Sequence, residues 1–149
     1  MDLITGLFSM DFTALVPNLN TMLGLIRFLL SLLVLAGPIS LLILGFLYLF
    51  MAPPEANYKF GFRTYFGMGS VEAWRFSQRM AGMAFGALGL LLLVIAIIVD
   101  LSFIGANTYQ VASRAMVCLL WQVGLIALVR LGIAILCAMF FTAKGNRRR

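Results

Sequence analysis

Three long runs of apolar residues dominate the chain and predict helices that cross a membrane. Residues 28–51 contain no charged side chain over 24 residues, and residues 80–99 contain none over 20. A third run, residues 115–141, is interrupted only by Gln122 and Arg130. At about 1.5 Å per residue each run can cross roughly 30 Å of hydrocarbon. The pattern therefore predicts an all-α integral membrane protein, with residues 1–149 as one membrane domain built on three transmembrane helices.

The N-terminal segment is apolar but too short for a fourth span. Residues 3–16 amount to 14 residues, contain Asp11 and are followed by Pro17. This length favours a short interfacial or re-entrant helix over a transmembrane helix. A signal peptide is disfavoured because no basic residue precedes Arg27.

Composition and charge agree with the membrane class and suggest an orientation. The chain is 63% apolar and 11% charged, with a formal net charge of +6. Its basic residues gather in the loop at 52–79 and in the tail after residue 141. The positive-inside rule then predicts an external N-terminus, with this loop and the C-terminus cytoplasmic. The charge indicates contact with anionic lipids rather than with nucleic acid.

Two features within the apolar runs predict irregular or close packing. Gly37-Pro38 lies midway along the first run, where proline removes an amide donor, so we expect a kink or else a hinge or binding niche. Gly82, Gly86 and Gly89 give the second run a face of small residues, which would serve packing within the chain or a homo-oligomer.

Arg130 is expected to lie within the membrane, because eleven apolar residues follow it. No carboxylate occurs in any of the three runs. The alternatives for its partner are a backbone carbonyl, a lipid phosphate, Glu72 or Glu55 from the loop, or a bound ligand; simple snorkelling to the interface is a further alternative.

The loop at 52–79 has the polar chemistry that the spans lack. Pro53 and Pro54 end the first helix, and Ser70 is a good N-cap for an amphipathic helix that leads into the second span. One interpretation of that helix is an interfacial anchor. Another is an anion cradle, in which backbone amides around Gly67 and Gly69 bind a phosphate or carboxylate together with nearby arginines.

The order of residues in this loop resembles the SdpI family of bacterial membrane proteins. The resemblance rests on Asn57, on Gly61-Phe62-Arg63-Thr64, on Ser70-x-Glu72-x-Trp74, and on Arg79 with Gly82. Tyr65 stands where that family usually has proline, and Ser77-Gln78 where it usually has Ala-Asn.

The resemblance implies a multi-pass protein of the bacterial plasma membrane that gives immunity to a membrane-active peptide toxin. It also implies a signalling role, in which the cytoplasmic loop binds a regulator. The alternative is a membrane-embedded enzyme or transporter for an anionic lipid-like substrate. Such an enzyme would need a general base, and Glu72 is the only carboxylate of the loop motif near the arginines. Because one carboxylate gives little support for catalysis, we expect no catalytic residues.

The candidate ligand- or partner-binding residues are polar, cationic or small, and all but one lie in the loop. Because the chain has no histidine and no cysteine pair at ligand spacing, we expect no metal and no cofactor. Glu72 is expected to pair with the arginines and to form one compact unit with Arg63, Trp74 and Arg79. The full set of candidates is Asn57, Gly61, Arg63, Thr64, Glu72, Trp74, Arg75, Gln78, Arg79 and Arg130.

Overall fold

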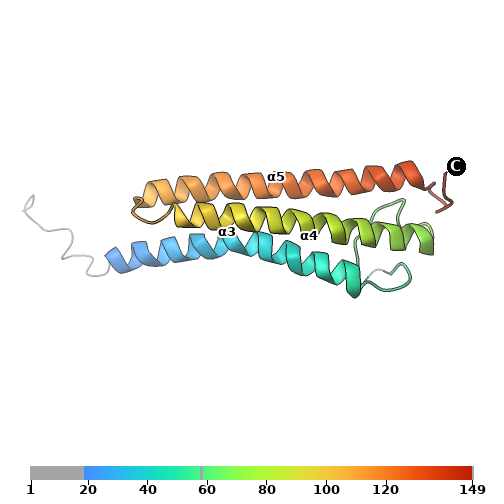
Figure 1. Ribbon diagram of the computed structural model, residues 1–149, viewed down its shortest axis with the longest axis horizontal. Coiled ribbons are helices and arrows are strands. Elements are labelled where there is room, and N and C mark those ends of the chain that lie inside the picture. Colours follow the sequence, from blue (N-terminus) through green and yellow to red (C-terminus); the bar gives the residue numbers. More distant parts are fainter. Residues whose placement is uncertain (1–18, 58, 149) are drawn as a thin grey trace, which may run out of the picture.

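Three long helices run side by side in the computed structural model, which describes residues 19–57 and 59–148 (Figure 1). They are α3 (Leu19–Phe50), α4 (Val71–Leu101) and α5 (Thr108–Phe140). The connection between α3 and α4 lies at the same end of the molecule as the C-terminal tail. We call this the loop end, and the end at which residues 102–107 join α4 to α5 the hairpin end.

All three helices are long and apolar enough to cross a membrane, as the sequence predicts. Each helix is, however, longer than its predicted span. α4 and α5, for example, contain 31 and 33 residues and are roughly 45–50 Å long, whereas the hydrocarbon core is roughly 30 Å thick. Residues 71–79, which include Glu72, Arg75 and Arg79, form the first turns of α4 itself. The helix expected at 3–16 lies outside the described residues.

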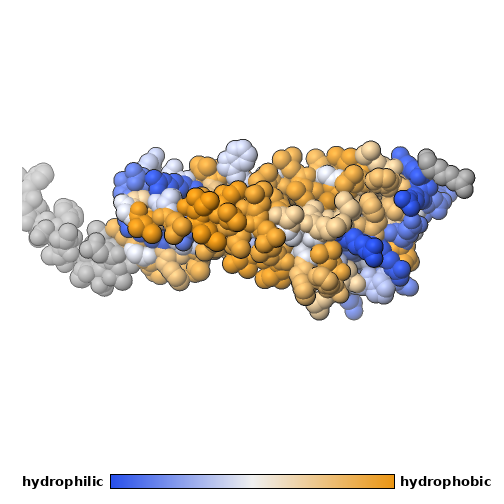
Figure 2. All heavy atoms as spheres, in the orientation of Figure 1, coloured by the Kyte–Doolittle hydropathy of each residue, from blue (hydrophilic) through white to orange (hydrophobic). Residues whose placement is uncertain are grey.

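The surface of the bundle is a hydrophobic belt bounded by polar ends. Figure 2 shows apolar residues over the middle of the molecule and hydrophilic residues gathered towards both ends. Large side chains such as Leu90, Leu120 and Leu128 are at least 60% exposed. This arrangement suits a bundle surrounded by lipid, where apolar exposure carries no cost.

A polar side chain from α5 resolves the break that proline makes in α3. Pro38 lies inside the helix and cannot donate to the carbonyl of Val34, four residues earlier. The amide nitrogen of Gln122 donates to that carbonyl at 2.9 Å. The helix is thus continuous but bent about midway (Figure 1), which is the kink that the sequence predicts. A β-carbon at Gly37 would collide with the Gln122 side chain, so glycine is needed for this approach.

The glycines of α4 serve contact with α3 within the chain. A β-carbon at Gly82 would lie 2.5 Å from the Leu49 side chain, and one at Gly89 would lie 3.0 Å from Leu42. On the facing helix, a β-carbon at Gly45 would lie 2.7 Å from the backbone nitrogen of Gly86. The first alternative, packing within the chain, therefore describes this face; an oligomer through the same glycines would have to displace α3.

Candidate functional site

Gln78 fixes the middle of the loop to the second helix. Its side-chain amide is buried and forms two hydrogen bonds with the backbone of Phe62: the oxygen accepts from the Phe62 N–H at 2.8 Å, and the nitrogen donates to the Phe62 carbonyl at 2.8 Å. The Phe62 ring is thereby held in the core against Phe85 and Tyr48, with ring centroids 5.6 and 6.1 Å away. The loop is drawn into the bundle at this point.

Trp74 fixes the start of the loop and the turn at Gly61. The indole is fully buried, and its N–H donates to the Pro53 carbonyl at 2.8 Å. Gly61 lies against the indole ring, with a φ of +124°. Only glycine accepts this combination readily, because a β-carbon would lie 2.5 Å from the ring and the backbone is in a region that L-residues avoid.

Asn57 and Thr64 shape local turns. The Asn57 side-chain oxygen accepts from the N–H groups of Lys59 and Phe60, at 3.0 and 2.9 Å. The Thr64 hydroxyl accepts from the Gly67 N–H at 3.0 Å. Such bonds stabilise turns by giving backbone donors a partner outside a helix or sheet.

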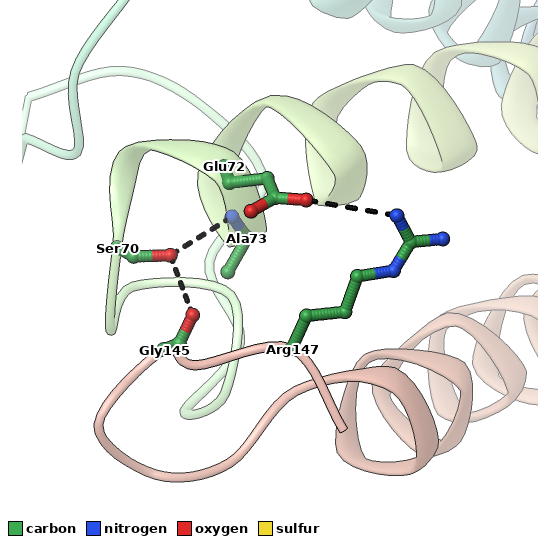
Figure 3. Close-up of polar contacts among 5 residues, drawn as sticks. All are labelled: Ser70, Glu72, Ala73, Gly145 and Arg147. Carbon is green, nitrogen blue, oxygen red and sulfur yellow. Dashed lines mark hydrogen bonds and ion pairs between the residues drawn. The ribbon is translucent and has the colours of Figure 1, made fainter. Parts of the chain in front are cut away.

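The C-terminal tail closes over the beginning of α4 (Figure 3). Ser70 is the N-cap: its hydroxyl oxygen accepts from the Ala73 N–H at 3.1 Å and donates to the Gly145 carbonyl at 2.8 Å. Gly145 has a φ of +78°, and its backbone packs directly on that of Gly69. The tail thus covers Gly69, while the Gly67 N–H is already bonded to Thr64, and the structure does not support an open cradle there.

The expectation for Glu72 is wrong. Its carboxylate forms an ion pair with Arg147 of the tail at 3.9 Å, rather than with Arg63, Arg75 or Arg79 (Figure 3). Both partners are exposed, at 64% and 69%. The pairing follows from the fold, because the tail passes the first turn of α4 while Arg63 faces a different side of the bundle.

Arg75 and Arg79 line one side of a groove between α4 and the tail. The groove has a volume of about 690 Å³ and an aromatic floor. Three arginines and one carboxylate surround it, and the lining residues are Val71, Glu72, Arg75, Phe76, Arg79, Phe140, Phe141 and Arg147. We call it the tail groove.

Arg63 and Arg130 lie along the same hollows on another side, between the loop, α3 and α5. Both line two neighbouring hollows, of about 400 and 340 Å³. The Arg130 guanidinium lies 5.9 Å from the centroid of the Phe62 ring, which is a cation–π distance. Tyr48 of α3 lines the larger hollow together with both arginines. We call this region the arginine pair.

The structure therefore divides the candidate residues into three groups instead of one compact unit. Asn57, Gly61, Thr64, Trp74 and Gln78 build the loop. Glu72, Arg75 and Arg79 border the tail groove, and Arg63 and Arg130 form the arginine pair.

Sequence reasoning missed the part that the tail and the first helix contribute to this region. Gly145 and Arg147 lie about 75 positions from the residues they contact, and Tyr48 lies in an apolar run where an aromatic residue is unremarkable. The clearest signal in the sequence was Gly145, an isolated glycine in a basic tail, which is typical of a turn.

Comparison with known proteins identifies a family. The model of the SdpI/YfhL protein family matches residues 55–142, which is more than half of the chain. The match begins at the loop and includes α4, α5 and the first residue of the tail turn. No curated protein and no solved structure matches the chain.

Proposed function

Because the chain belongs to the SdpI/YfhL family of membrane proteins, we propose that it protects the bacterial plasma membrane against a membrane-active peptide toxin. The observation that carries this proposal is the family match over residues 55–142. It includes the residues on which the resemblance to toxin-immunity proteins rests. The fold supports the proposal, since three apolar helices would place the chain in the membrane that such a toxin attacks.

The proposed orientation puts the loop end in the cytoplasm. The exposed arginines at this end include Arg75, Arg79 and Arg147, and the positive-inside rule favours such residues on the cytoplasmic side. The hairpin end would then face outward, where a secreted peptide arrives. We assign the signalling role to the tail groove, because its arginine rim and aromatic floor suit a partner with acidic and apolar side chains.

No observation favours the enzyme or transporter over the immunity protein. A hydrolytic site needs a general base within reach of its substrate. In the described part of the chain, neither hollow at the arginine pair has a carboxylate in its lining. Glu72 borders the tail groove, where its partner is Arg147.

The proposal is tested by expressing the full chain in a sensitive strain and challenging it with a panel of membrane-active peptides. We expect survival at peptide concentrations that kill the vector control. Gln78→Leu, which disconnects the loop from α4, should abolish protection, whereas Lys59→Gln at an exposed position should keep it. Membrane abundance is matched by immunoblot. If the wild-type chain at verified abundance protects against no peptide in the panel, the proposal is rejected.

A further inference from the structure

Arg63 and Arg130 share a concave surface whose other walls are apolar or aromatic. The larger hollow is lined by both arginines, by Tyr48 and Phe62, and by aliphatic residues that include Leu41, Leu44 and Ile126. The smaller hollow continues past the same two arginines along Ala134 and Ala138 of α5. Two cations thus sit at the junction of two cavities, above a hydrocarbon-like wall.

Positive charge at the arginine pair is not balanced by the described part of the chain. Neither lining contains a carboxylate, and the ion pair that the described residues do form joins Glu72 to Arg147 at the tail. Two neighbouring cations repel each other, and next to low-dielectric surroundings this repulsion is poorly screened. An anion between them would remove that cost.

Both arginines project from backbone that the fold holds in place. Arg63 follows Phe62, whose backbone amide and carbonyl are held by Gln78 at 2.8 Å each. Arg130 projects from the continuous helix α5 and lies 5.9 Å from the Phe62 ring centroid. Little ordering of the loop would therefore be required on binding, which favours affinity.

The level of the pair in the membrane indicates which anion is available. α5 is 33 residues long, or roughly 50 Å, so about 10 Å projects beyond each face of a 30 Å hydrocarbon core if the helix is centred. Arg130 lies ten residues, or roughly 15 Å, before the end of α5, and its backbone is then about 5 Å inside the core. An arginine side chain reaches the lipid phosphates from that depth.

We propose that Arg63 and Arg130 together bind the phosphate of an anionic phospholipid in the leaflet at the loop end. Paired arginines can each donate two N–H groups to phosphate oxygens, and phosphate is an acceptor that matches the planar guanidinium. The apolar wall at Leu41, Leu44 and Ile126 receives the adjoining acyl chain. The bound lipid is a ligand that ties the loop to α5, and the inference does not depend on toxin immunity.

Lipid titration of the purified full chain in detergent tests the site. The probes are dioleoylphosphatidylglycerol, dioleoylphosphatidylcholine, dioleoylglycerol and water-soluble glycerol phosphate, with thermal unfolding as the readout. We expect phosphatidylglycerol to raise the unfolding temperature in a saturable manner. The other three probes should give clearly smaller shifts, because they lack the net charge, the phosphate or the acyl chains.

Variants locate the effect. Arg63→Gln and Arg130→Gln should each weaken phosphatidylglycerol binding about tenfold or more, as expected when charged hydrogen bonds are lost. The double variant should lose little beyond either single one, since both arginines serve one phosphate. Arg75→Gln and Arg79→Gln in the tail groove are matched controls and should bind as the wild type does.

Three results would overturn the proposal. The first is full binding by the Arg63→Gln/Arg130→Gln double variant, and the second is an equal loss in the tail-groove controls. The third is an equal shift with phosphatidylcholine, dioleoylglycerol or glycerol phosphate, which would show that the net charge, the phosphate or the acyl chains, respectively, are not required. If the glutamine variants do not fold, Arg63→Lys and Arg130→Lys replace them. The lysine variants keep the positive charge but lose the planar guanidinium with its paired N–H groups, and they should weaken binding by a smaller factor. Unchanged binding in both variants rejects the paired-arginine geometry.

Discussion

At the residue scale, Gln78 and Gln122 perform the same task in different places. Each buries a side-chain amide and uses it to bond backbone groups that the surrounding apolar residues cannot satisfy. Gln78 serves the N–H and C=O of Phe62 in the loop, and Gln122 serves the carbonyl that Pro38 leaves free in α3. In both cases polarity inside the bundle is matched to an irregular backbone.

Replacing Gln78 with leucine should destabilise the chain strongly. Two buried backbone groups would lose their partners, and each such loss costs about 1–3 kcal/mol. We expect the unfolding temperature in detergent to fall and residues 59–66 to become sensitive to protease. Lys59→Gln, at an exposed position, is the control and should change neither. An unaltered unfolding temperature in Gln78→Leu would show that the Phe62 contacts do not anchor the loop.

Replacing the uncharged Ser70 should destabilise the chain more than replacing the charged Glu72. Ser70 caps α4 and also holds the tail, and removal of such a cap costs about 1 kcal/mol. The ion pair of Glu72 with Arg147 is long and exposed, and pairs of this kind contribute about 0–1 kcal/mol. Equilibrium unfolding should therefore place Ser70→Ala below Glu72→Gln in stability, with Glu72→Gln close to Glu55→Gln. A larger loss for Glu72→Gln would contradict this assignment.

At the scale of elements, the three long helices are stabilised by different local features. α3 is bent at Pro38 and leans on α5 through Gln122, whereas α4 offers glycines that let the backbones of α3 and α4 approach closely. α5 begins with a capping box in which the Asn107 and Gln110 side chains each bond the other's backbone N–H. The loop and the tail then join α4 to both of its neighbours at one end.

The link between Pro38 and Gln122 can be measured with a double-mutant cycle. Gln122→Leu in the wild type should cost about 1–3 kcal/mol, because the Val34 carbonyl is left buried without a donor. In a Pro38→Ala background the residue-38 N–H can bond that carbonyl, so the same substitution should cost clearly less. Equal costs in the two backgrounds would mean that Gln122 acts through packing and not through the freed carbonyl.

At the scale of the whole molecule, the two spans α4 and α5 lie between the loop and the tail and so put both on one side of the membrane. The bond between Ser70 and Gly145 joins segments 75 residues apart and requires this common side. The tail therefore serves as a brace for α4 as well as a source of positive charge.

Cysteine labelling should establish the orientation. In a background without Cys118 and Cys137, Lys59→Cys and Lys144→Cys should react with a membrane-impermeant maleimide only after permeabilisation. Ile104→Cys, at a position that is 81% exposed at the hairpin end, should react in intact cells. Labelling of Lys59→Cys in intact cells would reverse the proposed orientation. Labelling of only one of the two loop-end positions would refute the three-span fold.

The sequence by itself determined the class of protein and the three membrane-spanning helices of the described residues, because a run of uncharged residues long enough to cross hydrocarbon is a local property. It also indicated the kink at Pro38 and the cap at Ser70, which depend on single residues and their near neighbours. The residues of the loop were sufficient to suggest the family that the comparison identified.

Only the tertiary structure decided which side chains meet. Apolar residues surround each span almost uniformly, and lipid is as apolar as the bundle interior, so hydrophobic pattern does not reveal which helix face packs inward. The candidate arginines consequently looked like one group, although Arg63 and Arg130 line one hollow and Arg75 and Arg79 line the tail groove. Those contacts span 16 to 88 positions of sequence, and they exist because buried backbone groups need hydrogen-bond partners wherever the fold supplies them.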